Sequence, residues 1–401
     1  MKVLLVHNFY GSGAPSGENQ VFEAEKILLR AHGHVVTEFT RNSDEIRVMG
    51  RWGNVMGALA TSWNPWMTAA IQRQVNHFQP DVVHVHNTFP LISPGIFHAI
   101  GPRAARVLTL HNYRLFCPAA IPMRGGRVCT NCLDRRSAWP ALRHGCYRDS
   151  RVATLPLATS VALHRALGTW TGQVDAFIAL SEFQRQLMAQ SGLPLAKVHV
   201  KPNFYPGLPP VMPWPARLPY VVFAGRLTAE KGVVSLLRAW QAWGESAPEL
   251  RLVGDGDLRH QLEEMAKGLP IRFLGQVAGG EAQKQIARAR LLILPSEWFE
   301  GFPMVVREAF AFGTPAAVSD IGPLPTIVQD GRSGIVFEPG NAQSLLRAVS
   351  SVWQTPGLLE KLGLGARAEF ETKYTEDANY MTLMNIYANA ISISRSGLGS
   401  R

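Results

Sequence analysis

The stretch Leu291-Leu-Ile-Leu-Pro-Ser-Glu-Trp-Phe-Glu-Gly-Phe-Pro-Met-Val-Val-Arg-Glu308 passes from a buried strand into a helix. The continuous apolar run Leu291–Leu294 predicts the strand, and residues 304–312 predict the helix. Gly301 permits a tight turn between them. The helix would point its free N–H groups and the positive end of its dipole at an anion. Glu300 and Glu308 can then face one ligand and accept hydrogen bonds from its hydroxyl groups. The alternative is two surface glutamates.

Strand and helix patterns alternate outward from this stretch along the whole chain, which predicts an α/β fold with parallel sheets built from βαβ units. In the first half, the expected strands are 2–6, 35–39, 81–86, 106–110, 175–180 and 198–201. In the second half, they are 220–224, 249–253, 271–274, 291–294 and 316–319. The proline-rich segment 202–219 between the two sets is expected to be a stiff linker. The 401 residues therefore predict two doubly wound domains.

A basic loop follows the first strand of the second domain, in Gly225-Arg-Leu-Thr-Ala-Glu-Lys-Gly232. Arg226 and Lys231 would project from the carboxyl end of the strand, where open α/β sheets bind their ligands. Two cations at that edge can neutralise a diphosphate. A solvated basic loop is the alternative interpretation.

Four motifs of the second half now stand in order: Gly225–Gly232, Leu252-Val-Gly-Asp-Gly-Asp257, Phe273-Leu-Gly-Gln-Val277 and Glu300–Glu308. In this order and spacing, the chain resembles the retaining GT-B glycosyltransferases, the large family 4-like, group 1 set that includes bacterial mannosyl- and glucosyltransferases. The resemblance implies two Rossmann-like domains facing each other across a cleft. It also implies that a hexose moves from a UDP or GDP sugar to an acceptor with retention of configuration. The acceptor would be a lipid-linked molecule, an oligosaccharide or a polysaccharide.

The resemblance also implies roles for individual residues. Lys231 and Arg226 would bind the donor diphosphate, Glu300 hydroxyls of the donor sugar, and Glu308 those of the ribose. The further donor-binding residues are the amides of Val305 and Val306, the base-contacting segment from Gly275 to Val277, and Gly17 of a flexible glycine loop. The domains would span 1–203, with an insert at 113–150, and 214–375, and a helix at 376–392 would complete the first. Front-face attack, in which the leaving phosphate takes the acceptor proton, would need no catalytic metal.

Histidines end two strands of the first domain. His111 resembles the family histidine beside the donor sugar, and with Glu300 it is the candidate catalytic residue. His84 and His86 alternate on a strand and are interpreted as a polar end of the sheet, with His86 and Asn87 as possible acceptor contacts. Glu18, next to the glycine loop, could instead cap the following helix.

All four cysteines lie between residues 117 and 146. The pair Cys129 and Cys132 has the C-x₂-C spacing of a metal knuckle, and Cys117 and Cys146 flank it at compatible distances. Because disulfides are rare in the cytoplasm, a structural Zn²⁺ held by four thiolates is one hypothesis and free thiols are the other.

The net charge of +10 is concentrated in the first half, where 20 Lys and Arg residues face 11 Asp and Glu residues. Arginines cluster in the cysteine-bearing region, with Trp139 among them and Trp52, Trp63 and Trp66 upstream. Such a region could rest on an anionic membrane or hold a lipid diphosphate; a solvated basic loop is the alternative. We expect a cytoplasmic protein, peripheral on the inner face of the cell membrane, because no apolar run is long enough to span a bilayer.

Two rival functions fit some of these observations. A sugar-nucleotide epimerase of the same fold would turn over the nucleotide sugar without an acceptor. A basic nucleic-acid-binding protein would fit the charge, but the sequence contains no recognisable RNA or DNA module, so nucleic acid is not expected as a partner.

Overall fold

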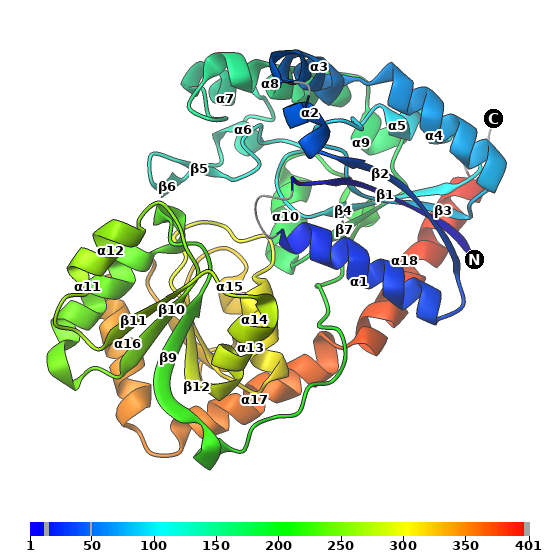
Figure 1. The fold of residues 1–401 in the computed structure, drawn as a ribbon. Coiled ribbons are helices and arrows are strands. Elements are labelled where there is room, and N and C mark those ends of the chain that lie inside the picture. The colour runs from blue at the N-terminus through cyan, green and yellow to red at the C-terminus, as the bar shows by residue number, and fades with distance from the viewer. Residues whose placement is uncertain (12–15, 49, 397–401) are drawn as a thin grey trace. The chain divides into compact units, whose positions relative to one another are not determined.

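The computed structural model describes residues 1–11, 16–48 and 50–396, without the side chains at 47, 51, 52, 54 and 55. The side chain of Trp52 and residues 12–15 of the predicted glycine loop therefore lie outside the described part of the chain. The chain divides into two compact units, the first formed by 1–122, 129–202 and 380–401, and the second by 123–128 and 203–379. Each unit contains one parallel six-stranded sheet (Figure 1).

The sheet of the first unit has the order β2 (Val35–Asn42), β1 (Lys2–Phe9), β3 (Val82–Asn87), β4 (Ala105–Leu110), β7 (Ala176–Ala179) and β8 (Val198–Val200). Its helices are α1 (Gly17–Ala31), α2 (Asp44–Val48), α3 (Gly50–Ser62), α4 (Pro65–Phe78), α5 (Ile96–Ile100), α6 (Asn131–Asp134), α7 (Trp139–His144), α8 (Arg151–Ala166), α9 (Thr169–Gly172) and α10 (Glu182–Gln190), and η1 (Leu195–Lys197) is a 3₁₀ turn.

The core of the first unit forms because apolar β-branched strand residues face apolar helix residues. Phe22 and Leu29 of α1 cover the sheet, together with Leu383 and Tyr387 of α18 (Glu376–Ser396). Ser16, and not Glu18, caps α1, since its hydroxyl accepts the amide of Asn19 at 3.4 Å.

The sheet of the second unit has the order β11 (Ile271–Gly275), β10 (Glu249–Val253), β9 (Leu218–Ala224), β12 (Ala289–Leu294), β13 (Ala316–Ser319) and β14 (Gly334–Phe337). Its helices are α11 (Val233–Trp243), α12 (Arg259–Met265), α13 (Gly279–Arg288), α14 (Met304–Ala311), α15 (Leu324–Ile327), α16 (Ala342–Gln354) and α17 (Leu358–Lys373). The 3₁₀ turns are η2 (Trp214–Ala216), η3 (Ala229–Lys231) and η4 (Gly244–Ser246), and β5 (Met123–Arg124) pairs with β6 (Arg127–Val128) as an antiparallel hairpin.

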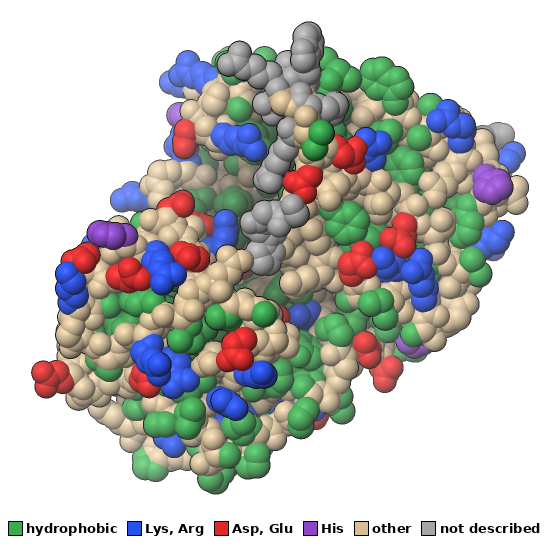
Figure 2. Space-filling view, in the orientation of Figure 1, with side chains coloured by type: hydrophobic (Ala, Val, Ile, Leu, Met, Phe, Trp, Pro, Cys, Tyr) green, Lys and Arg blue, Asp and Glu red, His purple; other side chains and the backbone are tan. Residues whose placement is uncertain are grey.

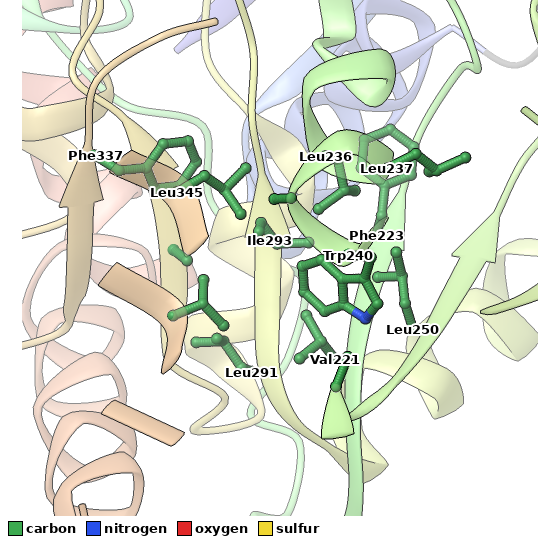
Figure 3. Packing of buried hydrophobic residues seen from close by; sticks show 14 of the residues in the cluster. Val221, Phe223, Leu236, Leu237, Trp240, Leu250, Leu291, Ile293, Phe337 and Leu345 are labelled. Carbon is green, nitrogen blue, oxygen red and sulfur yellow. The ribbon is translucent and has the colours of Figure 1, made fainter. Parts of the chain in front are cut away.

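Trp240 of α11 fills the centre of the second unit's core. Its ring packs among Val221, Leu250 and Leu291 of the sheet (Figure 3), and its indole N–H donates to the carbonyl oxygen of Pro248 at 2.9 Å. This packing holds β9 and α11 together, and with them the loop that joins them.

The doubly wound α/β prediction is confirmed, and every strand expected from the sequence is present. The edge strand β14 was not predicted, although its run Ile335-Val-Phe337 consists of residues that favour strands; it pairs with β13. Among the described residues, no helix has the length and hydropathy needed to cross a membrane.

Candidate active site

The two loops predicted to bind an anion leave neighbouring strands of the second unit. β9 pairs with β10 on one side and with β12 on the other, and both pairings are parallel. The strands that follow β9 are therefore added first on one side of it and then, from β12 onward, on the other side. The carboxyl ends beside such a change of side are where open α/β sheets bind ligands. The loops are also in direct contact, because the amide of Glu297 donates to the carbonyl oxygen of Glu230 at 2.9 Å.

Gly232 is required for that close approach. Its φ of +68° lies in the left-handed region, and a Cβ there would stand 1.8 Å from the carbonyl oxygen of Pro295. The sequence motif marked this glycine but not its contact, which depends on the packing of two loops distant in the chain.

Glu300 is the centre of the site. One oxygen of its buried carboxylate is reached by Lys231 Nζ at 2.7 Å, Ser296 Oγ at 2.5 Å and Trp298 Nε1 at 3.1 Å. The Lys231 ammonium also lies 5.3 Å from the centre of the Trp298 ring. Lys231, the predicted phosphate-binding cation, and Glu300, the predicted sugar-binding carboxylate, thus form a preorganised pair. The sequence did not predict the contacts of Ser296 and Trp298 with Glu300.

Arg226, the other predicted cation, has a different environment. Its side chain is 62% exposed, and its guanidinium donates to Glu230 at 3.0 Å. The hydroxyl of Thr228 holds the same Glu230 oxygen at 2.7 Å. Arg226 therefore reaches toward solvent, where a loosely restrained cation can turn to an arriving ligand.

The start of α14 follows the Glu300 loop, as predicted, but its two valines differ. Val306 is buried and its amide already donates to the carbonyl oxygen of Pro303 at 3.0 Å. Val305 is half buried, and its amide is the better candidate for contacting an anion.

Glu308 lies one turn into α14 beside Arg307. Burial raises the pKa of the Glu308 carboxyl, and Arg307 Nη2 at 3.5 Å opposes that shift. Arg307 is itself buried and donates to the carbonyl oxygen of Phe204, and burial lowers its pKa to about 10. Arg307 thus orients Glu308 and was not foreseen.

Glycines join the remaining strand ends at the same edge of the sheet. Gly275, with φ of +69°, ends β11 and accepts the amide of Gly254 at 2.8 Å, and a Cβ on Gly254 would lie 2.0 Å from the carbonyl oxygen of Gly225. Val277 is half buried just beyond Gly275. The predicted base-contacting segment therefore begins at the edge that carries Lys231 and Glu300.

In the first unit, His111 follows β4 and is held by a second histidine. His111 Nε2 lies 3.0 Å from His86 Nδ1, and the two rings stack with centres 5.2 Å apart. Burial lowers the pKa of both rings well below 6.5, so both are neutral near pH 7. Gly17 is exposed at the first position of α1.

A buried ion pair lies behind these histidines. Glu25 and Lys201 are in contact, and the side chains of both are fully buried. Glu25 also lies 3.5 Å from His86 Nε2 and 3.7 Å from His84 Nδ1. His84 itself bonds Tyr387 at 2.8 Å and Thr109 at 2.7 Å, so the polar end of the sheet expected at His84 and His86 is buried.

Among the residues that the structure describes, Glu25, His84 and His86 have ligand atoms within 4.8 Å of one another, which is close enough to hold a metal ion. Both nitrogens of His84 already have hydrogen-bond partners. The Lys201 ammonium pairs with the Glu25 carboxylate, so this carboxylate already has a positive partner without a metal ion.

A cavity of about 70 Å³ opens beside His111, entirely within the first unit. Its polar lining includes His86, Asn87, His111 and Arg114, and its apolar lining includes Leu157 and Val161 of α8 and Trp170. The sequence indicated His86 and Asn87 but not the contribution of α8, which is brought in by tertiary packing.

The four cysteines form no disulfide, and Cys117 and Cys132 are buried. The amide of Cys129 donates to the carbonyl oxygen of Pro122 at 2.9 Å, which brings Cys129 back toward the turn that contains Cys117. Burial raises the pKa of the Cys117 thiol to about 12, and the neighbouring Cys132 and Cys146 add to that shift.

Comparisons with known proteins cover both units. A family model described as "Glycosyl transferases group 1" matches residues 209–369, and one described as "Glycosyltransferase Family 4" matches residues 26–206. An uncharacterized glycosyltransferase of Methanocaldococcus jannaschii is 33% identical over 178 residues, covering 43% of this chain and 45% of that protein. The chain spans less than half the length of the first curated relatives it matches.

Two solved structures are similar over nearly the whole chain. HepE of Anabaena, in complex with UDP and glucose, has a TM-score of 0.62 at 17% identity, covering 97% of this chain and 100% of that one. Sucrose-phosphate synthase of Thermosynechococcus elongatus has a TM-score of 0.68 at 17% identity, covering 98% and 99%.

Proposed function

Because this chain belongs to the group 1, family 4-like glycosyltransferases and has their GT-B fold, we propose that it transfers a hexose from a nucleotide diphosphate sugar to a lipid-linked or polysaccharide acceptor, with retention of configuration. The observation that supports this best is the Lys231–Glu300 pair beside the start of α14. UDP and glucose bound to HepE support a UDP sugar as the donor.

In this proposal, the donor displaces internal contacts of the site. Lys231 and Arg226 bind the diphosphate, and the amide of Val305 adds a hydrogen bond at the positive end of α14. Glu300 accepts hydrogen bonds from the sugar, and Glu308 from the ribose. Gly275 and Val277 contact the base.

The chemical step follows from the same charges. Negative charge grows on the diphosphate as the bond to the sugar breaks, and preorganised cations stabilise that charge more in the transition state than in the ground state. A phosphate oxygen takes the acceptor's proton, so the step needs neither a general base nor a metal ion. Neutral His111, held by His86, offers a polar group to the charge that develops on the sugar.

The test measures nucleotide diphosphate release with a panel of nucleotide sugars, with and without acceptors. We expect Lys231→Ala and Glu308→Ala each to lower kcat/KM for the donor at least about tenfold, or ~1.4 kcal/mol. Lys284→Ala and Glu281→Ala are matched controls, because these residues form an exposed ion pair on α13 of the same unit. Wild-type kinetics in both site variants would refute the site, and turnover without any acceptor would indicate an epimerase.

A further inference from the structure

Helix α8 has apolar side chains on two opposite faces. Leu157 and Val161 point inward and line the cavity beside His111. On the outer face, Val152 is 82% exposed and Leu155 is 50% exposed. A single exposed apolar side chain is common on a protein surface, whereas several on neighbouring helices can mark an interaction site.

The helices that pack on α8 extend this outer face. α3 and α7 both pack against α8, and α2 packs against α3. They contribute Leu59, 67% exposed, and Trp139, 66% exposed, and further exposed apolar side chains at Met56 and Val48. We call these residues the α8 surface: Val48, Met56, Leu59, Trp139, Val152 and Leu155. Hydrophobic and Lys or Arg side chains are both visible at this end of the unit, where Figure 1 labels α3 and α7 (Figure 2).

The segment that leads into α8 carries an excess of exposed positive charge. Five arginines between α6 and the start of α8 are exposed, and the exposed acidic residues of that segment are Asp134 and Asp149. These arginines are Arg135, Arg136, Arg143, Arg148 and Arg151. The side chain of Arg151 donates to the backbone carbonyl of Arg143, a contact that leaves both positive charges uncompensated.

We propose that the α8 surface docks on an anionic phospholipid bilayer. Resting on the proposed function, this makes the acceptor a membrane-anchored one, reached from the cytoplasmic face. The apolar side chains enter the boundary between headgroups and acyl chains, and each arginine near the surface adds about 1 kcal/mol of attraction. A second copy of this chain is a poorer occupant, because a symmetric dimer would bring the same arginines against each other.

The experiment is co-sedimentation of the full chain with phosphatidylcholine vesicles, with and without phosphatidylglycerol. We expect binding only to the anionic vesicles, and weaker binding at high salt. The double variants Val152→Glu/Leu155→Glu and Arg143→Glu/Arg151→Glu should each lower the bound fraction at least about tenfold. The control is Leu364→Glu/Lys284→Glu in the second unit, where both residues are exposed and Leu364 is apolar.

Two further readouts separate the possible failures. Nucleotide diphosphate release with a soluble acceptor should be unchanged in the α8 variants, so lost vesicle binding with retained turnover supports docking. Vesicle binding without any transferase activity would refute the proposed function but not the docking surface. Wild-type protein that ignores anionic vesicles would overturn the docking proposal, as would a dimer that the α8 variants convert to monomers. Circular dichroism identifies any variant that fails to fold.

Discussion

Replacement of Lys201 by methionine should destabilise the first unit more than any exposed substitution. Lys201 is in contact with Glu25, and the side chains of both are fully buried. Methionine has a similar length but leaves the Glu25 carboxylate in the core without its cation. Removing one partner of a buried ion pair typically costs about 3 to 5 kcal/mol.

The cost converts into a measurable shift in melting temperature. For a unit of this size, each kcal/mol lowers Tm by about 2 to 4 °C, so Lys201→Met should lower the Tm of the first unit by about 6 to 20 °C. Scanning calorimetry measures this shift directly. The transition of the second unit should not move, which makes it an internal control.

The double variant Glu25→Leu/Lys201→Met tests the reason for that loss. If the unpaired charge causes it, removing both charges should restore most of the stability, since buried pairs can often be replaced by apolar residues at little cost. The reasoning is refuted if Lys201→Met melts within about 2 °C of the wild type, or if the double variant is no more stable than Lys201→Met.

Three further predictions concern pH, metal and backbone. Burial lowers the pKa of His7 and of His84 from 6.5 to about 4, so between these values the unfolded chain takes up protons that the fold excludes. The stability of the first unit should therefore fall as pH drops from 6.5 toward 4, by up to about 1.4 kcal/mol per pH unit for each histidine, and urea unfolding that is unchanged between pH 7 and 5 would contradict this. The four cysteines are not in the described group of side chains whose ligand atoms lie close enough to hold a metal ion, so zinc and free thiols remain two hypotheses for them; about one zinc per chain by elemental analysis would support the structural Zn²⁺, and metal-free folded protein would support free thiols. Gly232→Ala should weaken donor binding at least about tenfold, measured by calorimetry, because the new Cβ would collide with the carbonyl oxygen of Pro295 and force the loop to move. Gly279→Ala is the control: a Cβ at Gly279 would meet open space, so this variant should bind the donor as the wild type does.

Much of the fold could be predicted because its signals are local. A run such as Leu291–Leu294 shows its burial in its own composition, and Gly301 marks the turn that follows. β14 has the same kind of signal in Ile335-Val-Phe337 and was missed because the run is only four residues long with its glycine, a length that a loop segment can also have. α8 is a similar case, since Pro156 interrupts the apolar pattern from which a helix is normally recognised, although the helix accommodates it.

The sequence marked individual residues of the candidate site, but it could not predict their contacts. The motifs marked Lys231 and Glu300 for different parts of a ligand, and only the pairing of β9 with β12 shows that the two side chains bond each other. Glu25 and Lys201 lie 176 positions apart, so no local pattern could join them. Their role beneath His86 follows from tertiary packing alone.

Three ion pairs of similar chemistry lie at different positions relative to their sheets. Arg106 and Asp175 bond at the amino ends of β4 and β7, and Glu25 and Lys201 are enclosed in the core, so neither pair lies at the edge where a ligand of an open sheet binds. Lys231 and Glu300 use the same chemistry at the carboxyl ends of β9 and β12, on loops that remain partly exposed. There, the phosphates of a ligand can pair with Lys231 in place of the glutamate, and its hydroxyl groups can donate hydrogen bonds to Glu300 in place of the lysine. The position of the pair on the sheet, more than its residue types, therefore supports its assignment to donor binding.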